Sequence, residues 1–241
     1  MIRRFLNYIS VRRRFQGYFL LATIFYSFGI LLAFFVPMIT LNYSSFNRTE
    51  ILISIYQNYS ERIPALSNSI FSIYFDNFIL GILIMICPIA ILLAPTLIGK
   101  VNSSDLRILF VFSKNIALIL SIISAFRTFS KQDLYIYFVI MPINIFLVSF
   151  IHAIFEIPAF ILSFTFSLIL IDDIYDITSN YIAHKKSKTQ IKKVIGKLIV
   201  FLAIIAFMLL IAAYMEAKIT PYEIINGLKN YFQLNNIPIP K

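Results

Sequence analysis

Six apolar runs separated by short charged segments constrain this chain more than any other feature of its sequence. They occupy residues 18–39, 78–98, 106–126, 134–151, 157–171 and 198–214. A helix needs about 20 apolar residues to cross the roughly 30 Å hydrocarbon layer of a membrane, and these runs approach or reach that length. Charged residues make up only 13% of the chain, about half the share typical of soluble domains. The sequence therefore predicts an all-α integral membrane protein, a polytopic bundle of transmembrane helices.

The distribution of positive charge predicts how the runs cross the membrane. Arginines precede the first run and lysines fill the segment between the fifth and sixth, and loops rich in Lys and Arg remain cytoplasmic. Six crossings would place the lysine-rich segment outside. We therefore expect about five crossings, with run 106–126 interfacial or re-entrant because it carries Lys114 near its middle. The N-terminus then lies in the cytoplasm, and the C-terminus lies outside a prokaryotic cell membrane.

The chain reads as a single membrane domain, because no linker or internal repeat divides it. We expect a basic cytoplasmic segment at 1–17, an extracytoplasmic loop at 40–74, a basic cytoplasmic loop at 176–197 and an extracytoplasmic tail at 217–241. Apolar residues at helical spacing in the 40–74 loop predict a short amphipathic helix that lies on the membrane or on a partner.

Two groups of residues in these loops are candidates for modification or binding. The outer loop holds the glycosylation sequons of Asn42, Asn47 and Asn58, although such matches also arise by chance in a chain rich in Asn and Ser. The basic loop predicts contact with anionic lipid headgroups or a partner. Its candidate residues are Lys185, Lys186, Lys188, Lys192 and Lys193.

Ionisable residues next to apolar runs are the candidate functional groups, because burying them in a membrane is costly. His152 and Glu156 are four residues apart and share one face of a helix, and Pro158 predicts a break just after them. One interpretation is a proton or ion relay at a broken helix. The other is a turn between helices, in which the carboxylate lies at the next helix's N-terminus.

Two further residues complete the polar candidates. Glu216 ends the last run and could pair with His152, since both are expected at the outer edge of the membrane. The Thr220–Pro221 dipeptide after it predicts a helix stop and a new start capped by Thr220. Asn77 precedes the second run, where it is expected to cap a helix.

Catalytic and cofactor patterns are missing from the sequence. It shows no Walker motif, nucleophile–base arrangement or Gly-rich phosphate loop, and its two histidines, His152 and His184, are too far apart to suggest a metal site. The net charge of +10 is explained by membrane orientation, so no direct nucleic-acid binding is expected. We expect neither enzymatic activity nor a cofactor.

The residues that flank the fifth and sixth runs resemble two signatures of the stage II sporulation protein M family. His152, Glu156, Pro158 and Ala159 match the first signature. Ala212, Ala213, Glu216, Thr220 and Pro221 match the second, and Asn77 fits a third position. Ala153 departs from the family, which usually has Gly there.

The resemblance implies a helical membrane protein with about five spans that works as a non-enzymatic subunit or scaffold of a cell-envelope complex. Its expected partners are the lipid bilayer and either other membrane subunits, further copies of itself, or both. The alternative, based on the polar residues, is a subunit of a transporter or channel that uses His152, Glu156 and Glu216.

Overall fold

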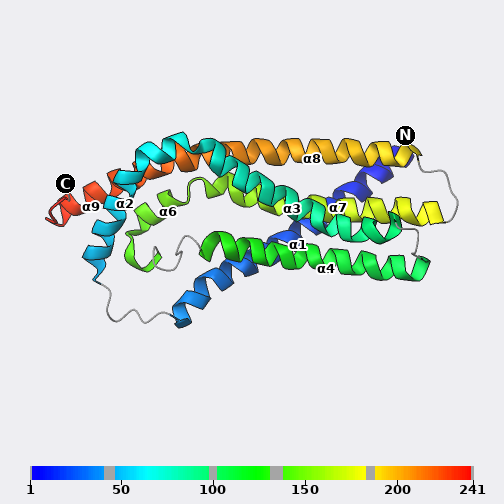
Figure 1. Ribbon diagram of the computed structural model, residues 1–241, viewed down its shortest axis with the longest axis horizontal. Helices are drawn as coiled ribbons and strands as arrows, with labels where there is room; N and C mark the ends of the chain where they lie inside the picture. The colour runs from blue at the N-terminus through cyan, green and yellow to red at the C-terminus, as the bar shows by residue number, and fades with distance from the viewer. Residues whose placement is uncertain (1, 41–46, 98–101, 131–137, 183–187, 240–241) are drawn as a thin grey trace. The chain divides into compact units, whose positions relative to one another are not determined.

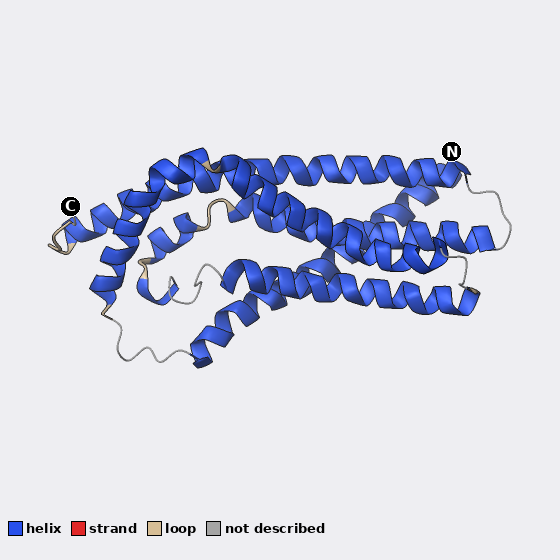
Figure 2. Cartoon of the chain, in the orientation of Figure 1, coloured by secondary structure: helices blue, strands red, loops and turns tan. Residues whose placement is uncertain are grey.

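The computed structural model describes residues 2–40, 47–97, 102–130, 138–182 and 188–239 (Figure 1). Within these ranges the chain is almost wholly helical and has no strand (Figure 2), which confirms the all-α prediction. The helices in chain order are α1 (Ile2–Thr40), α2 (Arg48–Asn68), α3 (Ile70–Leu97), α4 (Ser103–Ser130), α6 (Ile143–Ser149), α7 (Ala153–Ile182), α8 (Lys188–Tyr214), a π-helical turn (Met215–Ile219) and α9 (Thr220–Leu234).

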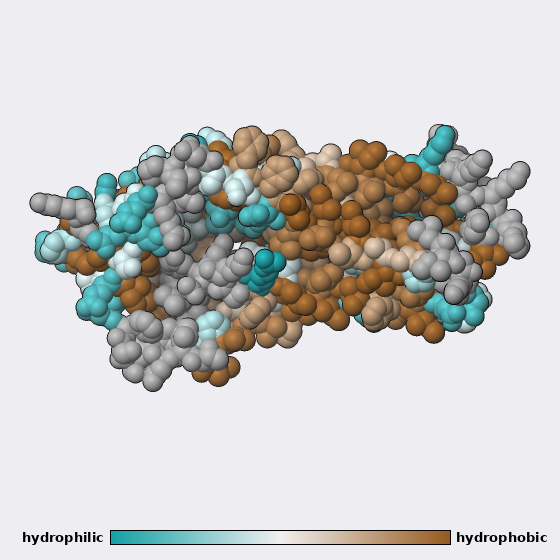
Figure 3. All heavy atoms as spheres, viewed as in Figure 1, coloured by the Kyte–Doolittle hydropathy of each residue, from teal (hydrophilic) through white to brown (hydrophobic). Residues whose placement is uncertain are grey.

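Five helical stretches of the described chain are long and apolar enough to cross a membrane, so the protein is a multi-pass integral membrane protein. They are Arg13–Ile39, Ile70–Pro95, Ser103–Phe129, Ala153–Asn180 and Gln190–Leu234. Large apolar side chains such as Phe28, Phe112 and Phe207 remain exposed on them, as expected of surfaces that face lipid. Figure 3 shows apolar side chains gathered over the long helices and hydrophilic ones over α2 and α9.

The expected number of spans is confirmed, but the third span is helix α4 rather than run 134–151. Run 106–126, predicted to be interfacial or re-entrant, lies in α4, which is as long as a spanning helix. Run 134–151 does not form one long helix: Pro142 precedes the seven-residue α6, and residues 131–137 lie outside the described ranges. The prediction about 106–126 was based on the distribution of Lys and Arg among the loops and on the cost of an unpaired Lys114, and this lysine is paired with Asp172.

Contacts divide the chain into two compact units, and the long helices contribute segments to both. Unit 1 comprises Met1–Gly29, Ile79–Ala125 and Pro158–Ala206. In its interior, Tyr26 of α1 lies against the rings of Phe160 and Phe164 of α7. Gly29 brings α1 close to α4, because a Cβ atom there would lie 2.4 Å from the carbonyl oxygen of Ile122. Glycine is therefore needed for this approach of two helices.

Unit 2 comprises Ile30–Phe78, Phe126–Ile157 and Phe207–Lys241, and it has its own apolar core. Helices α2 and α6 both pack against α9. Leu52 and Tyr56 of α2 are buried in this core with Phe232 of α9. The predicted helix in the outer loop is thus confirmed, but its apolar face packs on its own chain rather than on the membrane or a partner.

Candidate polar site in unit 2

The first part of the site is the turn that precedes α7. Helix α6 ends at Ser149, the chain turns through Phe150–His152, and the backbone N–H groups of Phe155 and Glu156 donate to the carbonyl oxygen of His152. His152 therefore sits at the start of α7, and Glu156 lies in its first turn. This matches the interpretation of a turn between helices with a carboxylate at the second helix's N-terminus.

The expected break just after Glu156 is wrong. Pro158 lies inside α7, which continues to Ile182, and the interruption comes before His152 instead. A proline inside a helix removes one backbone hydrogen bond, and in membrane helices neighbouring groups can satisfy the carbonyl that loses its donor. The preceding turn supplies the change of chain direction that the sequence reading had assigned to the proline.

The second part of the site is the junction between α8 and α9. The predicted helix stop is wrong. The helix passes through the π-helical turn Met215–Ile219 directly into α9. Ile219, rather than the predicted Thr220, occupies the N-cap position of α9, and the Oγ1 atom of Thr220 lies 3.5 Å from Nδ1 of His152. The π turn also carries Glu216, and single π turns often mark functional positions.

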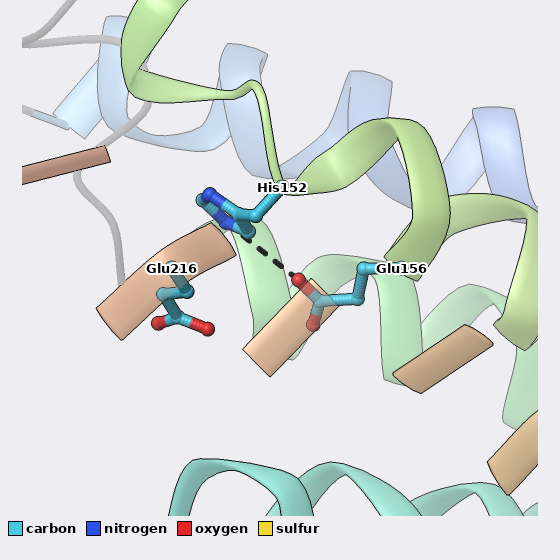
Figure 4. A group of neighbouring side chains, drawn as sticks. All are labelled: His152, Glu156 and Glu216. Atoms are coloured by element: carbon cyan, nitrogen blue, oxygen red, sulfur yellow. Dashed lines mark ion pairs between the residues drawn. The ribbon is translucent and has the colours of Figure 1, made fainter. Parts of the chain in front are cut away.

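The two parts meet in space. One ligand atom from each of His152, Glu156 and Glu216 lies within 4.8 Å of the others (Figure 4). His152 Nε2 is 3.6 Å from Oε2 of Glu156. The exposed fractions are 4% for His152 and 5% for Glu156, and Glu216 is partly buried. Glu216, which the sequence suggested as a partner of His152, thus lies near it, and Glu156 joins them.

Burial determines the charge of the histidine. Loss of hydration lowers the pKa of His152 to about 4, so the imidazole ring is neutral near pH 7. A neutral ring keeps one nitrogen lone pair available for a proton or a cation. The contact between His152 and Glu156 is accordingly not an ion pair of full charges, and its 3.6 Å length exceeds that of a hydrogen bond.

A second polar cluster lies in unit 1; an ion pair between its aspartates and the lysine-rich loop was predictable, but the pairing of Lys114 was not. Lys114 Nζ is 2.7 Å from Oδ1 of Asp172 and 2.7 Å from the hydroxyl oxygen of Tyr18. The Tyr18 hydroxyl donates to Oδ2 of Asp172. Next to it, Lys197 Nζ is 2.5 Å from Oδ2 of Asp173. The cost of a lysine within an apolar run was the one signal that could have indicated a partner.

The remaining predicted site residues are dispersed. Asn77 lies within α3, which begins at Ile70, so it does not cap that helix. At the start of α2, Oδ1 of Asn47 accepts a hydrogen bond from the backbone N–H of Thr49. Asn58 is exposed further along the same helix. Lys192 and Lys193 are exposed on α8, and Lys188 begins that helix. Asn42, Lys185 and Lys186 lie outside the described residues.

Comparison of the chain with protein-family models, with curated proteins and with solved structures gave no match.

Proposed function

We propose that this membrane protein is a non-enzymatic subunit or scaffold of a multi-protein complex in the cell envelope, of the kind that the stage II sporulation protein M resemblance implies. One observation carries the proposal. The two segments that resemble the family's signatures are far apart in the sequence, and their His152, Glu156, Glu216 and Thr220 side chains meet at one buried site. Independent chance matches to two signatures have no reason to converge in space.

The arrangement of unit 2 supports a role in assembly. Helices α2, α6 and α9 are joined around an apolar core of their own, beyond what five crossings of a membrane require. The outer faces of α2 and α9 carry exposed polar residues such as Gln57, Glu61, Glu223 and Lys229. A folded element with a polar surface next to the bilayer is suited to binding the domain of another subunit.

We also propose an orientation and a location. With α1, α3, α4, α7 and α8 as the spans, the N-terminal arginines, the α3–α4 connection and the α7–α8 connection lie on one side. That side is cytoplasmic by its excess of Lys and Arg, and α2, α6 and α9 lie outside. This topology explains the charge distribution without a re-entrant segment. The membrane is the cell membrane of a prokaryote, and the basic connections contact anionic lipid headgroups.

The direct test is purification of the full chain from its native membrane in a mild detergent. A companion protein in constant ratio, with a particle mass larger than that of the chain with its detergent, is the expected result. Identification of that companion by mass spectrometry names the process. A particle that contains this chain alone contradicts the proposal.

The buried polar site favours a second candidate function, that of a transporter or channel subunit. A histidine and two glutamates of low exposure are the kind of groups that hold protons or ions during transport. Replacement of Glu156 with Gln separates the two functions. An assembly role predicts lower abundance or loss of the companion, whereas a transport role predicts a folded, assembled protein that no longer supports flux.

A further inference from the structure

The side chains of His152, Glu156 and Glu216 have the chemistry of a transition-metal site, and one ligand atom of each lies within 4.8 Å of the others. An imidazole nitrogen and carboxylate oxygens are the ligands that Zn²⁺ takes in proteins, at about 2.0–2.2 Å. In a tetrahedral site such ligand atoms are about 3.4 Å apart. Nε2 of His152 and Oε2 of Glu156 are 3.6 Å apart, too long for a hydrogen bond but close to the edge of that tetrahedron.

Charge is the second reason. In their ionised form the two carboxylates together carry two negative charges, and such charges are costly to bury unless something compensates them. Glu156 is 5% exposed and directed at His152 (Figure 4). The two lysine–aspartate ion pairs of the described residues, Lys114 with Asp172 and Lys197 with Asp173, both lie in unit 1. A divalent cation would neutralise the cluster.

The surroundings of the histidine orient it for this role. Oγ1 of Thr220 is 3.5 Å from Nδ1, on the side of the ring away from Glu156. If the Nδ1–H group donates to this hydroxyl, the lone pair of Nε2 is directed at the glutamates. Ligand histidines in proteins are held in this way, by a partner on the other ring nitrogen.

The backbone conformation at the α8–α9 junction determines the direction of the Glu216 side chain. It lies in the π-helical turn between α8 and α9, where the wider turn shifts the helix register. The neighbouring residues Ala153 and Ala217 are small and buried, and His152 lies beside both Glu216 and Thr220, so the two chain segments approach closely. The site therefore ties the beginning of α7 to the α8–α9 junction within unit 2.

We propose that His152, Glu156 and Glu216 bind one Zn²⁺ ion that holds these two segments of unit 2 together. Three protein ligands leave a fourth position for water. The imidazole favours a first-row transition ion over Mg²⁺ or Ca²⁺, which prefer sites made only of oxygen atoms. This proposal does not depend on the proposed function, because a subunit of an envelope complex and a transporter could both contain such a clamp.

The test uses the full chain in detergent, treated with a chelator, incubated with Zn²⁺ and freed of unbound metal. Elemental analysis should find about one zinc ion per wild-type chain, also in the presence of excess Mg²⁺. Glu216→Gln should retain at least tenfold less zinc, and Thr220→Val should weaken binding about tenfold by releasing the ring. Glu223→Gln, an exposed glutamate of the adjoining α9, is the matched control and should bind like wild type.

A second measurement keeps the test decisive if a variant fails to fold. Wild-type chain loaded with Co²⁺ should show the visible absorption bands of a tetrahedral site, and Zn²⁺ should abolish them. Absence of zinc from wild-type chains, or equal retention by Glu216→Gln and wild type, overturns the proposal and leaves shared protons as the compensating charge. Loss of zinc binding would leave the search for a companion subunit unaffected, so the two proposals fail separately.

Discussion

Lys114 of α4 and Asp172 of α7 form an ion pair of 2.7 Å between two membrane-spanning helices of unit 1. The Tyr18 hydroxyl of α1 contacts both side chains, so three helices share one polar cluster. The rings of Tyr18 and Phe110 lie 4.9 Å and 4.4 Å from the lysine nitrogen and add favourable electrostatic contacts. These partners offset the cost of placing a lysine in a helix that is long and apolar enough to cross a membrane.

The first prediction concerns this pair. Asp172→Asn leaves Lys114 without its counter-charge in a partly buried place, so we expect a loss of about 1–3 kcal/mol of unfolding free energy. Thermal stability can be measured as the temperature at which the detergent-solubilised chain loses its monodisperse elution. Asp173→Asn is the matched control: its partner Lys197 has a side chain that is 42% exposed, and the expected loss is below about 1 kcal/mol. Equal losses for the two variants would show that the Lys114 pair carries no special weight.

Membrane crossing by α4 can be tested by labelling of single cysteines in a Cys87→Ser background. Ser103 begins α4, and Asn144 is exposed on α6, beyond the other end of α4. We expect a membrane-impermeant thiol reagent to label Asn144→Cys on intact cells. It should label Ser103→Cys only after the membrane is opened. Labelling of Ser103→Cys on intact cells would mean that the proposed orientation is reversed or that α4 does not cross.

The sequence predicted the features that depend on composition along the chain. Apolar runs and the distribution of cations give the helical class and the number of spans, because transfer into lipid depends on each segment nearly by itself. The amphipathic helix in the outer loop followed from spacing in the same way. What covers its apolar face, Phe232 among other residues, lies far along the chain and could not be read from that spacing.

The wrong predictions concern features that depend on a residue far along the chain or on the exact helix geometry. Lys114 was judged unpaired because Asp172 is in another helix, and run 134–151 was counted as a span in place of α4. Pro158 alone predicts a helix break, yet α7 continues through it, as membrane helices can when neighbouring groups satisfy the freed carbonyl. The π turn has no recognisable sequence signal, so the position of Glu216 beside both His152 and Glu156 emerged only in three dimensions.

Close packing of α1 against α4 gives the third prediction. In Gly29→Ala the new methyl carbon would lie 2.4 Å from the Ile122 carbonyl oxygen and 2.7 Å from Cβ of Ala125. Because the first contact is with backbone, the helices must move apart, at a cost of about 1–3 kcal/mol.

Gly196→Ala in α8 is the control, since no atom lies within 4 Å of the added carbon. It should be neutral or slightly stabilising, because alanine favours a helix by up to about 1 kcal/mol over glycine. The same heating assay compares the two, and unchanged stability of Gly29→Ala would contradict the close approach.

The last prediction concerns the attachment of α2 to α9. Phe232 is fully buried, and its ring lies 5.8 Å from that of Tyr56 in an edge-on arrangement. Phe232→Ala removes this contact from the core of unit 2, and truncation of a buried phenylalanine costs about 3–5 kcal/mol. We expect α2 to be released locally while the spanning helices remain folded, because its core residues lie within unit 2.

Hydrogen exchange followed by mass spectrometry should show faster exchange in peptides from 48–63 and no change in α7. Tyr222→Ala on the same helix is the control, because this side chain is 51% exposed and its loss should change stability by less than about 0.5 kcal/mol. Slow exchange of α2 in Phe232→Ala would mean that α2 is held by contacts other than this core.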